Sequence, residues 1–224
     1  MNSKRYLFLI LALFCFGMQA LELQEHEKWW DVKCREKNYL AQFNHWVGNE
    51  NALSRVLARL YIIYKGYKTI LDIPCGLCID YDAFKRNNPD IYYLGVDCSS
   101  TFIDAVVARG IPAIKGKVQD IPCQDSSFDV IFARHILEHL DSYETAIQEM
   151  VRVAKKEVLI IFFIKPIQGT QDKIVTAEVN GYPVYHNRYS KSKLETFLKS
   201  LDKVKNFTWQ EVKNQQESIL HILV

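Results

Sequence analysis

The stretch "LDIPCGLCIDYDAF", Leu71 to Phe84, supports two interpretations that lead to different proteins. As C-x-x-C, it pairs Cys75 with Cys78 at the junction of a strand and a helix, which is typical of a dithiol redox site. As D-x-P-C-G, it is a strand that ends in Asp72, followed by a tight turn that could hold a nucleotide-like cofactor. The rest of the chain favours the second interpretation.

Short apolar runs and helix-sized segments alternate along the chain on both sides of this stretch. The runs are continuous rather than alternating, as expected of strands buried on both faces of a parallel sheet. The alternation predicts an α/β fold: a doubly wound, mostly parallel, seven-stranded sheet with an antiparallel C-terminal strand and helices on both faces. The expected strands are 68–73, 91–97, 112–117, 128–133, 157–164, 204–212 and 218–224, and the expected helices are 81–86, 100–109, 142–154 and 190–201.

The order of motifs within residues 68–163 resembles the class I S-adenosylmethionine-dependent methyltransferases. The motifs are "TILDIPCG", then Asp97 in "YLGVDCS" 21 residues after Gly76, "IPCQDSSFDVIFARHILEHL" and "EMVRVAKKEVLIIFF". The resemblance implies an enzyme whose cofactor is S-adenosylmethionine. In such an enzyme Asp72 and the turn at Cys75 and Gly76 would hold the methionine moiety, and Asp97, followed by Cys98, would accept both ribose hydroxyls.

Two positions depart from the pattern of that family. The glycine-rich turn usually reads G-x-G where this chain has Gly76, Leu77 and Cys78, so the last glycine is a cysteine. The acid that often contacts adenine aligns with Lys117. Val118 and Gln119 are then the candidates for the adenine contact, through the backbone or the amide.

Methyl transfer requires that acceptor and donor be positioned and water excluded, and a general base only where the acceptor loses a proton. His135 follows the fourth expected strand directly and is the candidate base. The segment "GYPVYHNRYS", residues 181–190, precedes the last expected helix, where this family often covers the acceptor, which we expect to be a small molecule. The candidate acceptor contacts are Tyr185, His186, Asn187 and Tyr189.

Three other functions compete with methyl transfer. The CGLC pair is compatible with a thioredoxin-like thiol oxidoreductase. The sequence "HILEH", His135 to His139, matches the inverted zinc-peptidase pattern, with Glu138 as its base. A non-catalytic binding module could use the same fold. Both short motifs are less specific than the series of spaced elements, so we expect no metal and treat the cysteines as buried free thiols.

The N-terminus carries a separate signal. Lys4 and Arg5 precede an uncharged run from Tyr6 to Leu21, which is 16 residues long against the roughly 20 needed to span a bilayer. We interpret residues 1–20 as a signal or membrane-anchor segment, residues 21–67 as a helical lead-in and residues 68–224 as the methyltransferase domain. The protein would then be exported or membrane-associated through residues 6–21, or cytoplasmic if translation starts at Met18.

The overall charge argues against nucleic acid as a partner. The chain of 224 residues has 28 basic and 26 acidic side chains, a formal net charge of +2. A nucleic-acid-binding surface needs a clear basic excess. We therefore expect a small-molecule partner and no nucleic acid.

Overall fold

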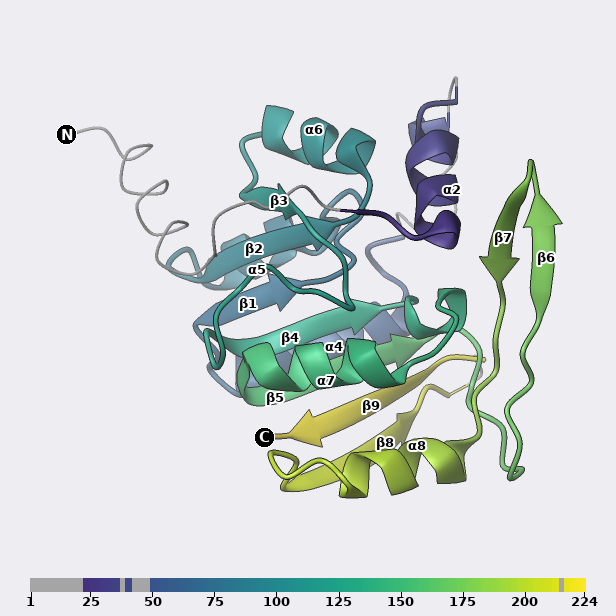
Figure 1. Ribbon diagram of the computed structural model, residues 1–224. Coiled ribbons are helices and arrows are strands. Elements are labelled where there is room, and N and C mark those ends of the chain that lie inside the picture. Colours follow the sequence, from purple (N-terminus) through teal and green to yellow (C-terminus); the bar gives the residue numbers. More distant parts are fainter. Residues whose placement is uncertain (1–21, 37–38, 42–48, 214–215) are drawn as a thin grey trace.

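The computed structural model describes residues 22–224, except 37–38, 42–48 and 214–215. Within these residues seven strands form one sheet in the order β3-β2-β1-β4-β5-β9-β8 (Figure 1). Strands β1 to β5 pair in parallel, and β9 is antiparallel to both of its neighbours, β5 and β8. The predicted fold class is confirmed.

The helices and strands have the following bounds. The strands are β1 (Thr69–Asp72), β2 (Tyr92–Asp97), β3 (Ala113–Lys115), β4 (Phe128–Arg134), β5 (Ala154–Phe162), β6 (Thr176–Val179), β7 (Tyr182–Tyr185), β8 (Asn206–Glu211) and β9 (Ser218–Leu223). The helices are α2 (Glu25–Cys34), α4 (Leu53–Tyr64), α5 (Tyr81–Asn87), α6 (Ser100–Ala108), α7 (Glu144–Val153) and α8 (Lys191–Lys199), with one 3₁₀ turn, η1 (Leu137–His139).

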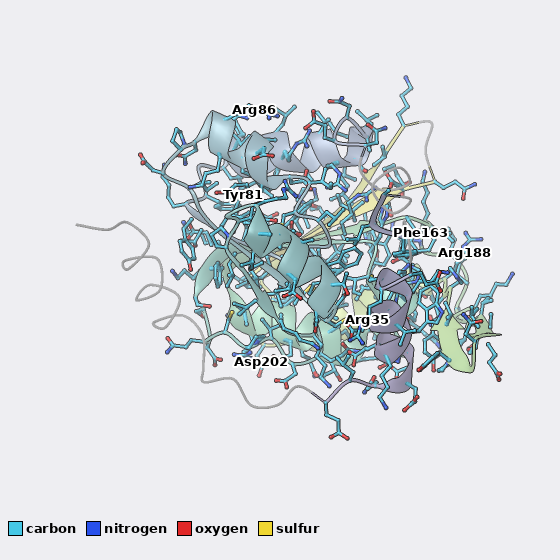
Figure 2. The ribbon with its side chains drawn as sticks, turned by 90° about the horizontal axis from the view of Figure 1, so that it is seen from above. Arg35, Tyr81, Arg86, Phe163, Arg188 and Asp202 are labelled. Atoms are coloured by element: carbon cyan, nitrogen blue, oxygen red, sulfur yellow. The ribbon has the colours of Figure 1, made fainter. Side chains whose placement is uncertain are left out.

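Helices cover both faces of the sheet, which explains the continuous apolar runs. On one face α7 buries Ile147, Met150 and Val151, whose spacing places them on one side of the helix, and α8 adds Leu194 and Leu198. On the other face α4, α5 and α6 form a second core cluster. Figure 2 separates the two faces, with Arg86 of α5 on one side and Asp202, beyond α8, on the other.

The strand order reverses between β1 and β4, because β2 and β3 continue the sheet on one side of β1 and β4 and β5 on the other. In open α/β sheets the crevice at the carboxyl ends of the strands at such a reversal is the usual place for a ligand. The end of β1 at Asp72, the end of β2 at Asp97 and the end of β4 at Arg134 therefore lie at the edge where a site is expected.

The structure corrects one part of the sequence interpretation. Residues 176–185 form a separate antiparallel hairpin, β6–β7, where we expected only a connection around residues 181–190. Asn180 and Gly181 at its turn have φ values of 54° and 79°, and an Asn-Gly pair with positive φ at both positions is a strong hairpin signal. The Asn180-Gly181 pair is visible in the sequence, but Gly181 and Pro183 also suit an ordinary connector, so the sequence did not decide between the two.

The hairpin and α2 lie together beyond the carboxyl edge of the sheet, at the right in Figure 1. Within residues 21–67, predicted to be helical, α2 and α4 are observed. Over the described part of the chain no helix is both long and apolar enough to cross a membrane. The predicted signal or anchor segment lies outside that part.

Candidate functional site

A cavity of about 440 Å³ opens at the carboxyl edge of the sheet. Its walls combine the loop after β1, the ends of β2 and β4, the turn η1, and residues from α2 and the segment after β7. Figure 2 shows Phe163 and Arg188 at the same end of the molecule as the β6–β7 hairpin. A smaller pocket of about 30 Å³ adjoins the cavity and shares Trp30, Asp97 and Cys98 with it.

The loop after β1 brings backbone to the cavity wall. Gly76 and Cys78 have φ values of 49° and 51°, in the left-handed region that glycine adopts most readily. The Cys75 N–H donates to the Val96 carbonyl at 2.9 Å and so ties the loop to β2. Cys78 therefore occupies a backbone conformation that favours glycine, as expected where the family has its second glycine. Cys75 and Gly76 line the cavity.

Asp97 links the end of β2 to this loop. Its Oδ2 accepts the Gly76 N–H and its Oδ1 accepts the Ser99 N–H, both at 2.9 Å. Burial raises the pKa of Asp97 to about 6, although these two backbone donors act in the opposite direction. Asp97 lines both the cavity and the smaller pocket, as does Cys98 next to it. A carboxylate has about four lone-pair sites, so Asp97 can still accept from a ligand.

Asp72 lies deeper in the wall and has a different character. It accepts a hydrogen bond from the Tyr93 hydroxyl and is 4% exposed. Burial, followed by the negative charge of Asp80, raises its pKa to about 8. Without a ligand Asp72 is therefore mostly protonated at neutral pH, and a cationic group placed beside it would favour its ionised form.

The smaller pocket contains the two residues expected to replace an adenine-binding acid. Val118 and Gln119 line it together with Lys117. The Nε2 and Oε1 atoms of Gln119 are both buried, and neither finds a hydrogen-bond partner among the described residues. A buried amide without partners is costly, so this side chain is suited to a ligand that both donates and accepts hydrogen bonds.

His135 lines the cavity and is held by a residue that the sequence did not suggest. Its Nε2 lies 2.7 Å from Oε1 of Glu217, which precedes β9. Burial lowers the pKa of His135 to about 4, although the hydrogen bond with Glu217 raises it. Burial alone would raise the pKa of Glu217, but the hydrogen bond from His135 and the charge of Arg134 outweigh it and lower that pKa to about 2. At neutral pH the pair is therefore an uncharged imidazole beside a carboxylate.

The four predicted acceptor contacts divide into two groups. His186 lines the cavity, and the Tyr185 carbonyl lies 3.0 Å from Nδ1 of His139. Asn187 and Tyr189 are buried and bond the Leu140 carbonyl instead, at 2.8 and 3.0 Å. Tyr185, Asn187 and Tyr189 are therefore not among the residues that line the cavity, and the last two hold the connection between the hairpin and α8 against η1.

The CGLC pair does not have the environment of a reactive dithiol. Cys75 and Cys78 are buried, and burial, with the neighbouring thiol, raises the pKa of Cys75 well above its ordinary value. A reactive thiol needs a lowered pKa. Both sulfurs pack against Gly95, where a Cβ atom would lie 2.9 Å from each of them. The two thiols thus fill the space beside β2 that the missing side chain of Gly95 leaves open.

The "HILEH" segment does not form a metal-binding helix. Only a single 3₁₀ turn, η1, forms there, and Glu138 is buried with Oε1 accepting the Phe163 N–H at 2.8 Å. His135 and His139 face different partners, Glu217 and the Tyr185 carbonyl. The described residues contain no group of three potential ligands placed to hold a metal ion.

Sequence reasoning missed several residues of the cavity wall. Arg55 comes from α4, Asp80 from the start of α5, Arg134 from the end of β4, and Trp30 from α2. Arg134 directly precedes the candidate base, so its position at the end of an expected strand could have predicted that it lines the site. Arg55 could not be found in this way, because its helix precedes β1 in the chain and only the packing of α4 beside α5 brings it to the site.

A family model described as a methyltransferase domain matches residues 71–162, which include the loop after β1 and the ends of β2 and β4. These residues form a methyltransferase domain. The curated relatives that it resembles include ajmaline N-methyltransferase of Rauvolfia serpentina, which is 32% identical over 107 residues. That match covers 42% of this chain and about a third, 35%, of the relative.

Solved structures share the fold of this methyltransferase domain at low sequence identity. PigF, solved with SAH, has a TM-score of 0.64 and 14% identity, over 87% of this chain and 62% of that one. A SAM-dependent methyltransferase of Methanosarcina mazei has a TM-score of 0.52 and 16% identity, over 72% and 95% of the two chains. The [4+2]-cyclase SpnF has a TM-score of 0.52 and 16% identity, over 69% and 73%. The fold alone therefore does not determine the reaction.

If the thiols only fill space, Cys75→Ser and Cys78→Ser should each leave the affinity for S-adenosylhomocysteine within about tenfold, because backbone rather than sulfur forms the loop. Isothermal titration calorimetry measures this affinity. An insulin-reduction assay is the control for the alternative function. If the natural chain reduces insulin and neither variant does, the thiol oxidoreductase becomes the favoured function.

Proposed function

We propose that this chain transfers a methyl group from S-adenosylmethionine to a small-molecule acceptor bound in the cavity. The observation that carries the proposal is the position of Asp97. Its carboxylate holds the loop after β1 through the Gly76 N–H and lines both the cavity and the adjoining pocket. The Asp97 carboxylate is thus placed to bind a ribose whose two neighbouring groups lie in the cavity and in the smaller pocket.

The residues present fit the cofactor. Asp97 would accept the ribose hydroxyls, and the unpartnered amide of Gln119 would pair with the donor and acceptor atoms on the edge of adenine. Asp72 and the backbone at Gly76 would hold the amino-acid end, whose ammonium group would lower the raised pKa of Asp72. The departure at Lys117 is compensated in this proposal by Gln119.

When bound, S-adenosylmethionine supplies an electrophilic methyl group. Glu217 holds Nε2 of His135, and because its carboxylate can only accept, it favours the tautomer with the proton on Nε2. The imidazole then keeps its lone pair on Nδ1. It could take the proton of an acceptor hydroxyl as the oxygen bonds to carbon, or the proton of the ammonium that an acceptor amine becomes on bonding. Burial keeps water away from this step.

The remaining cavity wall suits a flat, apolar acceptor. His139 stacks on Phe163 with ring centroids 5.3 Å apart, and both Trp30 and His186 meet the His139 ring edge to face, each at 5.3 Å. Burial lowers the pKa of His139 to about 4, so this imidazole is uncharged at neutral pH. Four rings from four parts of the chain therefore line one region of the cavity.

Titration of the protein with S-adenosylhomocysteine tests the proposal, and one binding site per chain is expected. Release of S-adenosylhomocysteine from S-adenosylmethionine, measured in the presence of phenols, amines and carboxylic acids in turn, then identifies the acceptor class. A folded protein that does not bind S-adenosylhomocysteine would refute the proposal and favour the non-catalytic module.

For an acceptor that must lose a proton, His135→Gln should lower kcat/KM by about 10²- to 10⁴-fold, the usual contribution of a general base. Because the pKa of His135 is lowered to about 4, the imidazole is protonated only near that pH. The rate of the natural chain should therefore fall on the acid side near pH 4 and not near 6.5. His186→Gln is the control, because His186 lines the same cavity. Equal losses in the two variants would exclude a special role for His135.

We also propose that residues 6–21 target the protein to a membrane or for export, because a basic flank precedes an uncharged apolar run. Deletion of residues 1–19 should move the protein from the membrane fraction to the soluble fraction without loss of S-adenosylhomocysteine binding. Fractionation followed by N-terminal sequencing measures this. A natural chain that is soluble with an intact N-terminus, or one that starts at Met18, would contradict the proposal.

A further inference from the structure

The floor of the cavity holds a cluster of buried arginine and acidic side chains. Arg55 and Arg59 both pair with Asp80, the second at 3.0 Å, and Arg134 pairs with Glu217 at 3.1 Å. Three guanidinium groups thus share two carboxylates. Of the other two acids in the wall, Asp97 accepts from the Gly76 and Ser99 N–H groups, and Asp72 is mostly protonated at neutral pH.

Arg134 is the member of this group with unused hydrogen-bonding capacity. Its side chain is 12% exposed, it lines the cavity, and its Nε finds no hydrogen-bond partner in the described part of the chain. Burial, with the nearby charge of Arg55, lowers the pKa of Arg134 to about 10, so the group stays charged at neutral pH. Glu217 pairs with Arg134 but leaves this Nε donor unused, and a buried donor is costly unless a further acceptor binds it.

We propose that Arg134, with Arg55 beside it, binds a carboxylate of the methyl acceptor, so that the substrate is an aromatic or otherwise planar carboxylic acid. The inference rests on the proposed function. Arg134 and Arg55 line the cavity but not the smaller pocket at Gln119. Arg134 also shares Oε1 of Glu217 with His135, which places the anion site beside the candidate base. The planar guanidinium matches a carboxylate geometrically, and the ring cluster supplies the apolar surface for the rest of the acceptor.

The test compares benzoate with benzamide, two probes of nearly equal shape that differ in charge. NMR titration of the natural chain, saturated with S-adenosylhomocysteine, should show benzoate binding at least about tenfold more tightly than benzamide, the usual range for a hydrogen-bonded charge. Arg134→Gln should abolish this preference, and Arg134→Lys should retain part of it. Arg86→Gln is the matched control, because Arg86 lies on α5 with its side chain 65% exposed. Thermal melting verifies that each variant is folded.

The cofactor also carries a carboxylate. A second comparison therefore distinguishes whether Arg134 binds the carboxylate of the acceptor or that of the cofactor. 5′-Methylthioadenosine lacks the amino-acid end of S-adenosylhomocysteine. If Arg134→Gln weakens S-adenosylhomocysteine but not 5′-methylthioadenosine, Arg134 binds the carboxylate of the cofactor and the proposal is wrong. Equal binding of benzoate and benzamide by the natural chain would also overturn it. If S-adenosylhomocysteine does not bind at all, the proposed function fails, whereas the benzoate preference can still be measured in the protein alone.

Discussion

Asp97→Ala should weaken the binding of S-adenosylhomocysteine by about 2 kcal/mol or more, which is roughly 30-fold in affinity. The variant removes the group expected to accept both ribose hydroxyls. It also removes the acceptor of the Gly76 and Ser99 N–H groups, each at 2.9 Å, so the loop after β1 loses one of its two hydrogen-bonded links to the end of β2. Isothermal titration calorimetry at pH 7.5 measures the change, where Asp97, with a pKa of about 6, is ionised.

Two further variants make this result interpretable. Asp104→Ala, on the exposed side of α6, should leave the affinity unchanged because its side chain is remote from the cavity wall. Asp97→Asn keeps the shape and one acceptor oxygen, and should bind more weakly than the natural chain while staying folded. Unchanged affinity in a folded Asp97→Ala protein would remove Asp97 from the cofactor site.

Asp80→Ala should lower the free energy of unfolding by about 3–5 kcal/mol, the usual cost of removing one partner from a buried ion pair. Asp80 is 1% exposed and is the common partner of Arg55 and Arg59, both buried. Its loss removes the acidic partner that these two buried guanidinium groups share. Urea denaturation measures the change, which is a large part of the 5–15 kcal/mol typical of a domain.

Asp82→Ala is the matched control, two residues further along the same helix. Its side chain is 61% exposed and lies 3.7 Å from Arg109, so the pair is solvated. We expect a loss of less than about 1 kcal/mol for this variant. Similar losses in both variants would show that the Asp80 cluster is hydrated rather than buried.

Much of the fold is determined by local patterns in the sequence. Continuous apolar runs predicted the strands, and their alternation with helices predicted a doubly wound sheet, because a strand buried on both faces has no polar side. Boundaries moved by a few residues: β5 begins at Ala154 rather than 157. The hairpin β6–β7 was missed although its Asn180-Gly181 turn was visible. The candidate cofactor residues Asp72, Gly76 and Asp97 could be suggested because they lie at or just after strand ends, which a parallel sheet brings to one edge.

What the sequence by itself determined is therefore the sheet, the edge at which a ligand site is expected and the motif residues that follow its strands. Only the tertiary structure decided which other side chains reach that edge. Arg55 arrives from a helix before β1, and Glu217 arrives from the turn before β9, 82 residues after His135. No periodicity or spacing in the sequence predicts such contacts, because they depend on how segments far apart in the chain pack around the sheet. The same packing buried Asn187 and Tyr189 and turned His186 to the cavity, although all three lie in one short segment.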